Sequence, residues 1–240
     1  MDSIEKKKPK GYGEKKAERE EEMETPATGK VIAIMGESGS GKTTSMRNLD
    51  PTTTYYIDCD KKGLSWKGWK QQYNKENKNY KRTSESETIS ELITHINNNV
   101  PRIKVIVIDT INGIMIDDEF KRMNEKGYDK WQDLAVAVYN LISICNELRN
   151  DLTVIFIAHS QTDREDDGYK LTRIKTSGRK LDKIVLESKF TTVLLARCIN
   201  GKYVFETSSN NSTAKSPMGA FDSRIIDNDI VEVLKALEDY

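Results

Sequence analysis

Short apolar runs along the chain predict the buried strands of a sheet. In chain order they are Val31 to Met35, Thr53 to Asp58, Ile103 to Ile108 and Leu152 to Ile157. Consecutive apolar residues over such lengths are typical of strands covered on both faces, as in parallel sheets. Apolar residues at spacings of three and four predict a helix from about Asp129 to Arg149. Strands that alternate with helices predict an α/β fold with right-handed crossovers.

The pattern changes after residue 185, where an antiparallel extension is expected. Two apolar runs, Phe190 to Cys198 and Tyr203 to Thr207, flank the dipeptide Asn200-Gly201. Asn-Gly between apolar runs is a strong signal for a β-hairpin. The final segment, Asp229 to Tyr240, has the periodicity of a short amphipathic helix.

The first 28 residues contain a lysine-rich stretch followed by a glutamate-rich stretch, with almost nothing to bury. Such composition predicts a disordered charged tail at 1–28, followed by one folded domain at 29–240. A frayed charged helix or a specific binding arm stays open as an alternative for the tail.

The overall charge and composition indicate how the chain could contact nucleic acid and in which compartment it is expected. The formal net charge is +0, so a nucleic-acid site must be a local basic patch. No apolar stretch approaches the length of a membrane span, and because no apolar run follows the N-terminal lysines, we expect no secretory signal. Three separated cysteines without metal spacing indicate reduced thiols, so we expect a cytoplasmic protein.

A glycine-rich motif follows the first apolar run and matches the pattern G-x-x-x-x-G-K-[ST]. Its residues, with the next threonine, are Gly36, Glu37, Ser38, Gly39, Ser40, Gly41, Lys42, Thr43 and Thr44. The glycines let backbone N–H groups surround phosphate oxygens, and a helix expected from Thr43 to about Asn48 adds positive charge at its N-terminus. Lys42 would contact the β- and γ-phosphates, and the Thr43 hydroxyl would contact Mg²⁺. The motif predicts that the chain binds ATP, or a related nucleoside triphosphate, with Mg²⁺.

Acidic residues end the second and third predicted strands. Asp109 would lie at the carboxyl edge of the sheet, where a carboxylate can hold Mg²⁺ through a water; helix capping is the alternative. Asp58 and Asp60 end the second run, and either could orient the attacking water. Both could instead be turn formers before Gly63.

The order of these motifs, with Ile155-Phe156-Ile157-Ala158-His159, resembles the RecA core. More narrowly, it resembles small RecA-like ATPases of phages, some of which anneal single strands. Residues 210–221 are similar to the closing segment of that group. The resemblance implies a RecA-like P-loop core with an antiparallel hairpin extension. It also implies location in the cytoplasm of a host cell and ATP bound between subunits of a homo-oligomer. The partners that the resemblance implies are single-stranded DNA and a single-strand binding protein. It implies no association with a membrane.

The resemblance also implies roles for three residues. Asp60 matches the position of the water-polarising acid, although RecA has Glu there, and the shorter side chain puts the hydrolysis rate in question. His159 stands where RecA has a Gln that contacts the γ-phosphate and signals to the DNA-binding loop. Lys215 resembles a lysine that reaches the γ-phosphate of a neighbouring subunit. A capping role for His159 and a surface role for Lys215 are the alternatives.

Two basic stretches are candidates for contact with DNA. The stretch from Lys61 to Arg82 interleaves cations with Trp66 and Trp69, which suits single strands, but the tryptophans are expected in the core. The second stretch follows His159 in what we expect to be a mobile loop. In RecA-like proteins the corresponding loop binds single-stranded DNA, and its candidate contacts here are Lys170, Arg173, Lys175, Arg179 and Lys180.

Other functions of a P-loop protein stay open at this point. A small-molecule kinase needs an arginine-bearing lid, for which the chain offers little. A helicase loader or AAA-type accessory ATPase usually has a helical lid after the fourth strand, and none is evident. An ATP-gated structural module with negligible hydrolysis is compatible with Asp at position 60.

Overall fold

The computed structural model describes most of the chain after the predicted tail. The predicted tail, 1–28, and the candidate DNA contacts Arg179 and Lys180 lie outside the described residues. The described residues are 30–125, 129–164, 168, 170–177 and 185–240.

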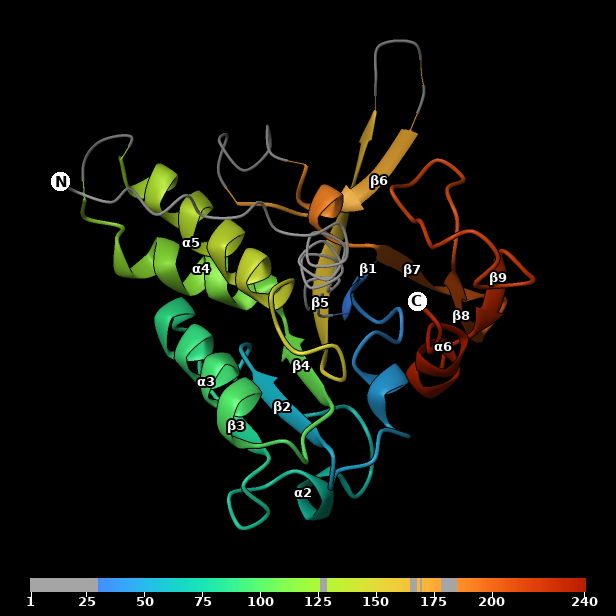
Figure 1. Cartoon of the computed structure of the whole chain (residues 1–240). Coiled ribbons are helices and arrows are strands. Elements are labelled where there is room, and N and C mark those ends of the chain that lie inside the picture. Colours follow the sequence, from blue (N-terminus) through green and yellow to red (C-terminus); the bar gives the residue numbers. More distant parts are fainter. Residues whose placement is uncertain (1–29, 126–128, 165–167, 169, 178–184) are drawn as a thin grey trace, which may run out of the picture.

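A mixed sheet forms the centre of the domain (Figure 1). Its order is β3-β2-β4-β5-β1-β7-β8-β9, and β6 pairs with β5 off this path. The pairs from β3 to β7 in this order are parallel, whereas β6, β8 and β9 add antiparallel pairs. The strands are β1 (Lys30–Gly36), β2 (Thr54–Asp58), β3 (Tyr80–Arg82), β4 (Val105–Asp109), β5 (Thr153–Arg164), β6 (Lys170–Ile174), β7 (Thr192–Ile199), β8 (Lys202–Glu206) and β9 (Ile225–Asp227).

Helices cover both faces of the sheet. α3, α4 and α5 pack on one face, and α6 with η1 lies on the other (Figure 1). None of the described helices combines the length and the apolar content needed to cross a membrane. The helices are η1 (Thr44–Met46), α2 (Trp69–Gln72), α3 (Ser86–Asn99), α4 (Ile111–Lys121), α5 (Asp129–Cys145), η3 (Leu186–Lys189) and α6 (Ile230–Ala236).

The alternation of side chains along the central strands produces two apolar cores. In β1, Val31, Ala33 and Met35 face the α3–α5 layer, and Ile32 and Ile34 face the layer of η1 and α6. All five are buried, because β1 is paired on both sides, with β5 and β7. The predicted α/β fold with a parallel core and an antiparallel hairpin is therefore confirmed, with β7 and β8 around Asn200-Gly201.

The prediction of a helix from Thr43 to about Asn48 was wrong, because the helix that forms is shorter and of the 3₁₀ type. The chain makes only the 3₁₀ helix η1, with hydrogen bonds such as Arg47 N–H to Thr44 O at 3.1 Å. Two threonines and a serine favour helix poorly, and Pro51 follows soon after. So short a helix has little dipole, and positive charge at the motif therefore comes mainly from Lys42 and the loop amides.

The segment after His159, expected to be a mobile loop, is in large part a hairpin. β5 continues seven positions past Ile157 to Arg164 and pairs antiparallel with β6. The hairpin projects away from the sheet (Figure 1). Its residues are mostly polar because few neighbours cover it, so the apolar signal of a strand is missing here. Thr162 and Thr172 still join their hydroxyls across it at 2.9 Å.

Candidate active site

The glycine-rich motif forms a loop at the carboxyl edge of the parallel strands, directly after β1. Gly39 and Gly41 have φ angles of 78° and 91°, a region that residues with a Cβ rarely adopt. The Ser40 N–H donates to the Glu37 carbonyl at 3.2 Å and closes the turn. Glycines at these two positions therefore give the loop its shape, as the motif predicted.

Lys42 lies along the inside of this loop. Its ammonium donates to the carbonyls of Gly36 at 2.8 Å and Glu37 at 2.6 Å. Burial lowers the pKa of Lys42 to about 8, although Asp109 opposes the shift. The loop therefore holds a positive charge with little water around it, where a phosphate group would interact with it strongly.

Asp109 and Thr43 meet beneath the loop, although 66 positions separate them in the sequence. The Thr43 hydroxyl donates to Asp109 Oδ2 at 2.8 Å, and the buried Tyr56 hydroxyl donates to the same oxygen at 2.7 Å. Asp109 Oδ1 is buried and has no partner among the described residues. Burial raises the pKa of Asp109, and the hydrogen bonds from Tyr56 and Thr43 oppose that shift.

This pair of residues fits Mg²⁺. A hydroxyl oxygen and an unpartnered carboxylate oxygen are hard ligands, and Mg²⁺ commonly takes one or two protein ligands together with waters and phosphate oxygens. Thr43 and Asp109 are thus the residues that would hold the ion, and their assignment as metal ligands stays a prediction.

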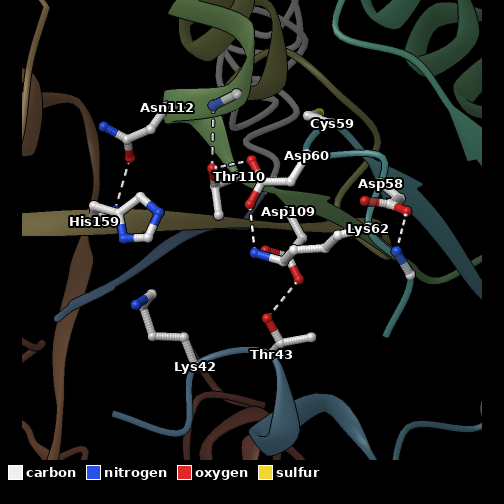
Figure 2. Close-up of polar contacts among 12 residues, drawn as sticks. Lys42, Thr43, Asp58, Cys59, Asp60, Lys62, Asp109, Thr110, Asn112 and His159 are labelled. Carbon is white, nitrogen blue, oxygen red and sulfur yellow. Dashed lines mark hydrogen bonds and ion pairs between the residues drawn. The ribbon is translucent and has the colours of Figure 1, made fainter. Parts of the chain in front are cut away.

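The two acids after β2 have different surroundings (Figure 2). Asp58 is buried and turned away from the loop, and its Oδ2 accepts from the Gly63 N–H at 2.8 Å and the Tyr80 hydroxyl at 2.6 Å. Asp60 faces the site: Oδ1 accepts from Thr110 at 2.9 Å and Oδ2 from Lys62 at 2.5 Å. This geometry favours Asp60 over Asp58 as the acid that orients water.

The charge of Asp60 suits such a role. Burial acts to raise its pKa, but the hydrogen bonds from Lys62 and Thr110 outweigh burial, and the net pKa is lowered. Asp60 is therefore ionised at neutral pH and able to accept a proton from water. Its catalytic role stays a prediction.

His159 lies beside the loop, at the register position of β5 that pairs with Gly36. Burial and the nearby Lys42 lower its pKa, so the ring is neutral at neutral pH. Its backbone N–H donates to Asn112 Oδ1 at 2.7 Å, and its carbonyl accepts from the Lys175 N–H at 2.7 Å. Asn112 in turn donates to the Lys175 carbonyl at 2.8 Å. His159 is thus tied both to α4 and to the end of the β5–β6 hairpin.

Four residues of the site had no predicted role: Tyr56, Lys62, Thr110 and Asn112. Thr110 caps α4 by accepting from the Gly113 N–H, and it orients Asp60. A threonine between an apolar strand and a helix is a capping signal that could have been found. Tyr56 and Asn112 carry no local signal, because their partners Asp109 and His159 are distant in sequence. Lys62 lies in the basic stretch from Lys61 to Arg82, and its partner Asp60 is only two positions away.

A pocket of about 270 Å³ is lined by Lys42, Thr43, Lys62, Thr110 and His159 of this site, whereas Asp60 and Asp109 lie behind its lining residues. A second pocket of about 470 Å³ lies on the other side of the loop and includes Lys170. The residues that line the first pocket are Ser38, Gly39, Gly41, Lys42, Thr43, Thr44, Lys62, Ser65, Thr110, His159 and Tyr203.

Lys215 does not line either pocket. Its backbone N–H and carbonyl both pair with Val193 of β7, at 2.9 and 2.8 Å. These two backbone hydrogen bonds hold the segment against the sheet. A role on a neighbouring subunit stays a prediction.

The tryptophans of the first basic stretch pack against the domain. Trp66 makes edge contacts with Tyr56 and Tyr73, and its Nε1–H donates to Gln72 at 2.6 Å. Trp69 packs on Tyr80 with ring centroids 5.5 Å apart. These rings therefore pack against the core, which was the alternative to contact with single-stranded DNA for this stretch.

Comparison with known proteins agrees with this geometry. A family model described as an AAA domain matches residues 28–218, which is most of the chain and includes the loop, Asp60, Asp109 and His159. A search of curated proteins found no match. The extent of the family match and the P-loop at the edge of a parallel sheet lead to one conclusion: the chain belongs to this AAA domain family, and its folded part is a P-loop ATPase-type domain.

Proposed function

We propose that this chain is an ATP-hydrolysing recombination protein of phage type that binds single-stranded DNA and promotes annealing or strand pairing. In this proposal the loop amides and Lys42 hold the β- and γ-phosphates. Mg²⁺, when bound at Thr43 and Asp109, would neutralise charge on the phosphate oxygens. Asp60 orients a water and takes its proton while the water oxygen bonds to the γ-phosphorus. The bond from that phosphorus to the bridging oxygen breaks, and ADP leaves with the electron pair.

The connection between His159 and the hairpin supports a link between ATP and DNA. β5 runs without interruption from the phosphate site into the hairpin that carries Lys170 and Arg173. Lys170 and Lys175 are exposed, and the Lys175 backbone is bonded to both His159 and Asn112. A change at His159 upon phosphate binding would therefore act directly on the backbone of a basic hairpin.

An AAA-type accessory ATPase, such as a helicase loader, is the second candidate, since the family model is described as an AAA domain. Proteins of that type would be expected to carry a helical lid after the fourth parallel strand. In the described part of the chain, β5 is followed by strands, the short η3 and the single helix α6. The hairpin therefore favours the recombination function.

The decisive experiment measures ATP hydrolysis with and without single-stranded DNA. Stimulation by DNA is expected. A rate that DNA leaves unchanged would contradict the proposed coupling, and transfer of phosphate to a nucleotide acceptor would indicate a kinase.

A charge-reversal pair tests the hairpin. Lys170→Glu with Lys175→Glu should weaken DNA binding at least tenfold and reduce its salt dependence, because fewer cations neutralise phosphates. Lys235→Glu on α6 makes one such charge reversal, half that of the hairpin variant, at a lysine paired with Glu232, and should leave DNA binding unchanged. Equal losses in the hairpin and control variants would remove the assignment of this surface.

A further inference from the structure

One aromatic ring stands at the end of the phosphate pocket. Among the described residues, Tyr203 is the only Phe, Trp or Tyr that lines the 270 Å³ pocket. It comes from β8, in the antiparallel extension, and is 47% exposed. A Cβ on Gly41 would lie 2.8 Å from the Tyr203 ring, so the ring packs directly against the loop.

The exposure of Tyr203 contrasts with the other rings nearby. Trp66 makes an edge contact with Tyr73, and Tyr80 packs on Trp69. Tyr203 makes no ring–ring contact among the described residues. A large ring that is half exposed inside a pocket is available to a ligand.

A buried amide packs against the same glycine of the loop. Asn228 is 6% exposed, and its Oδ1 lies 3.1 Å from the position of a Gly41 Cβ. Its Nδ2 is buried without a hydrogen-bond partner among the described residues. Arg47 donates to the Asn228 carbonyl at 2.8 Å and holds this segment against η1.

A nucleotide whose phosphates lie at Lys42 would place its base near Tyr203. In the proposed mechanism the terminal phosphate lies near Thr110 and His159, which line the pocket, and near Asp60, to which Thr110 donates. The ribose and base must therefore extend in the other direction, past Gly41 and Thr44. The hydroxyls of Thr44 and Ser65 form a hydrogen bond of 2.9 Å, and both residues line the pocket together with Tyr203.

We propose that Tyr203 stacks on the base of the bound nucleoside triphosphate and forms the base end of the site. The inference rests on the proposed nucleotide function and adds to it the subsite that distinguishes a nucleotide from a bare polyphosphate. Stacking favours any nucleobase, because every base has a π face.

Titration calorimetry with ATP and with inorganic tripolyphosphate tests the subsite in the full chain. The wild type should bind ATP more tightly than tripolyphosphate. Tyr203→Ala should weaken ATP binding about tenfold, the scale of one stacked base, and leave tripolyphosphate binding unchanged. Tyr203→Phe keeps the ring and should bind ATP within about twofold of the wild type.

Three results would overturn the inference while leaving the nucleotide function intact. In the first, the wild type binds ATP and tripolyphosphate equally well. In the second, Tyr203→Ala binds ATP normally. In the third, Tyr203→Ala loses both ligands equally, which would mean that the ring only shapes the loop at Gly41. A wild type that binds neither ligand would instead refute the proposed function, and the inference with it. Thermal unfolding of each variant checks that the fold is retained.

Discussion

The hydrogen bond from Tyr56 to Asp109 should make a measurable contribution to stability. Tyr56→Phe removes only the hydroxyl, 2.7 Å from Asp109 Oδ2. The ring remains in contact with Trp66 and Tyr73, with centroids 6.2 and 5.4 Å away. The substitution therefore leaves packing intact and removes one donor from a buried carboxylate.

The structure sets the expected size of the effect. Asp109 is 2% exposed, so water cannot replace the lost donor, and Oδ1 already has no partner. A hydrogen bond to a charged group contributes about 1.5–3 kcal/mol. We expect the free energy of unfolding to fall by about 2 kcal/mol near neutral pH. In a domain of this size that loss lowers Tm by about 4–8 °C.

The effect should depend on pH in a defined direction. Because the pKa of Asp109 is raised in the folded state, the folded protein holds a proton that the unfolded chain has lost. Its stability therefore falls as pH rises from the unfolded pKa to the folded pKa of Asp109. Loss of the Tyr56 hydroxyl raises the folded pKa further and widens this window. The destabilisation by Tyr56→Phe should then be larger at about pH 8 than at about pH 5.

Tyr73→Phe is the matched control for this measurement. Tyr73 is equally buried in the same aromatic cluster, and its hydroxyl has no hydrogen-bond partner of good geometry among the described residues. Urea unfolding of both variants at the two pH values gives the comparison. Equal losses in the two variants, or a Tyr56→Phe loss that does not change with pH, would refute the reasoning.

Further predictions concern the chemistry of the site and its assembly. Asp60→Asn should reduce ATP hydrolysis about a hundredfold and leave ATP binding intact; if Asp58→Asn alone had that effect on turnover, the assignment would be wrong. ATP affinity should decline as pH rises through about 8, because Lys42 then loses its proton. Calorimetry in buffers of different ionisation enthalpy should show proton uptake on binding, and a constant affinity between about pH 7 and 9 would contradict this. Lys215→Ala should lose ATPase activity but still bind ATP, and mixing it with Lys42→Ala should restore some activity as protein concentration rises. Co-assembly of the two variants, seen by light scattering, without recovered activity would exclude a shared site.

Features that depend on local sequence were predictable. The strand into Gly36, the motif to Thr43 and the hairpin at Asn200-Gly201 each have a short signal with a direct physical cause. The apolar run before Asp109 likewise put that carboxylate at the edge of the sheet. The fold class and the core of the phosphate site follow from such signals alone.

Features that depend on distant contacts were not predictable. Asp58 and Asp60 are two positions apart, and their surroundings differ because Asp58 accepts from Tyr80 and Gly63, whereas Asp60 accepts from Thr110 and Lys62. The length of β5 depends on pairing with β6 across exposed polar residues. Tyr203 meets Gly41 only after the whole sheet has formed, so no window of sequence contains both.

The continuity of β5 has a mechanical consequence. From His159 to Arg164 the strand rises about 17 Å, at about 3.3 Å per residue. No loop or hinge interrupts it, and β6 braces it along this length. If nucleotide binding tilts β5 at His159, as the proposed function requires, a strand braced in this way would move Arg164 farther than His159. Under that proposal, shortening the hairpin by a pair of residues on each strand would reduce this displacement without altering the phosphate site.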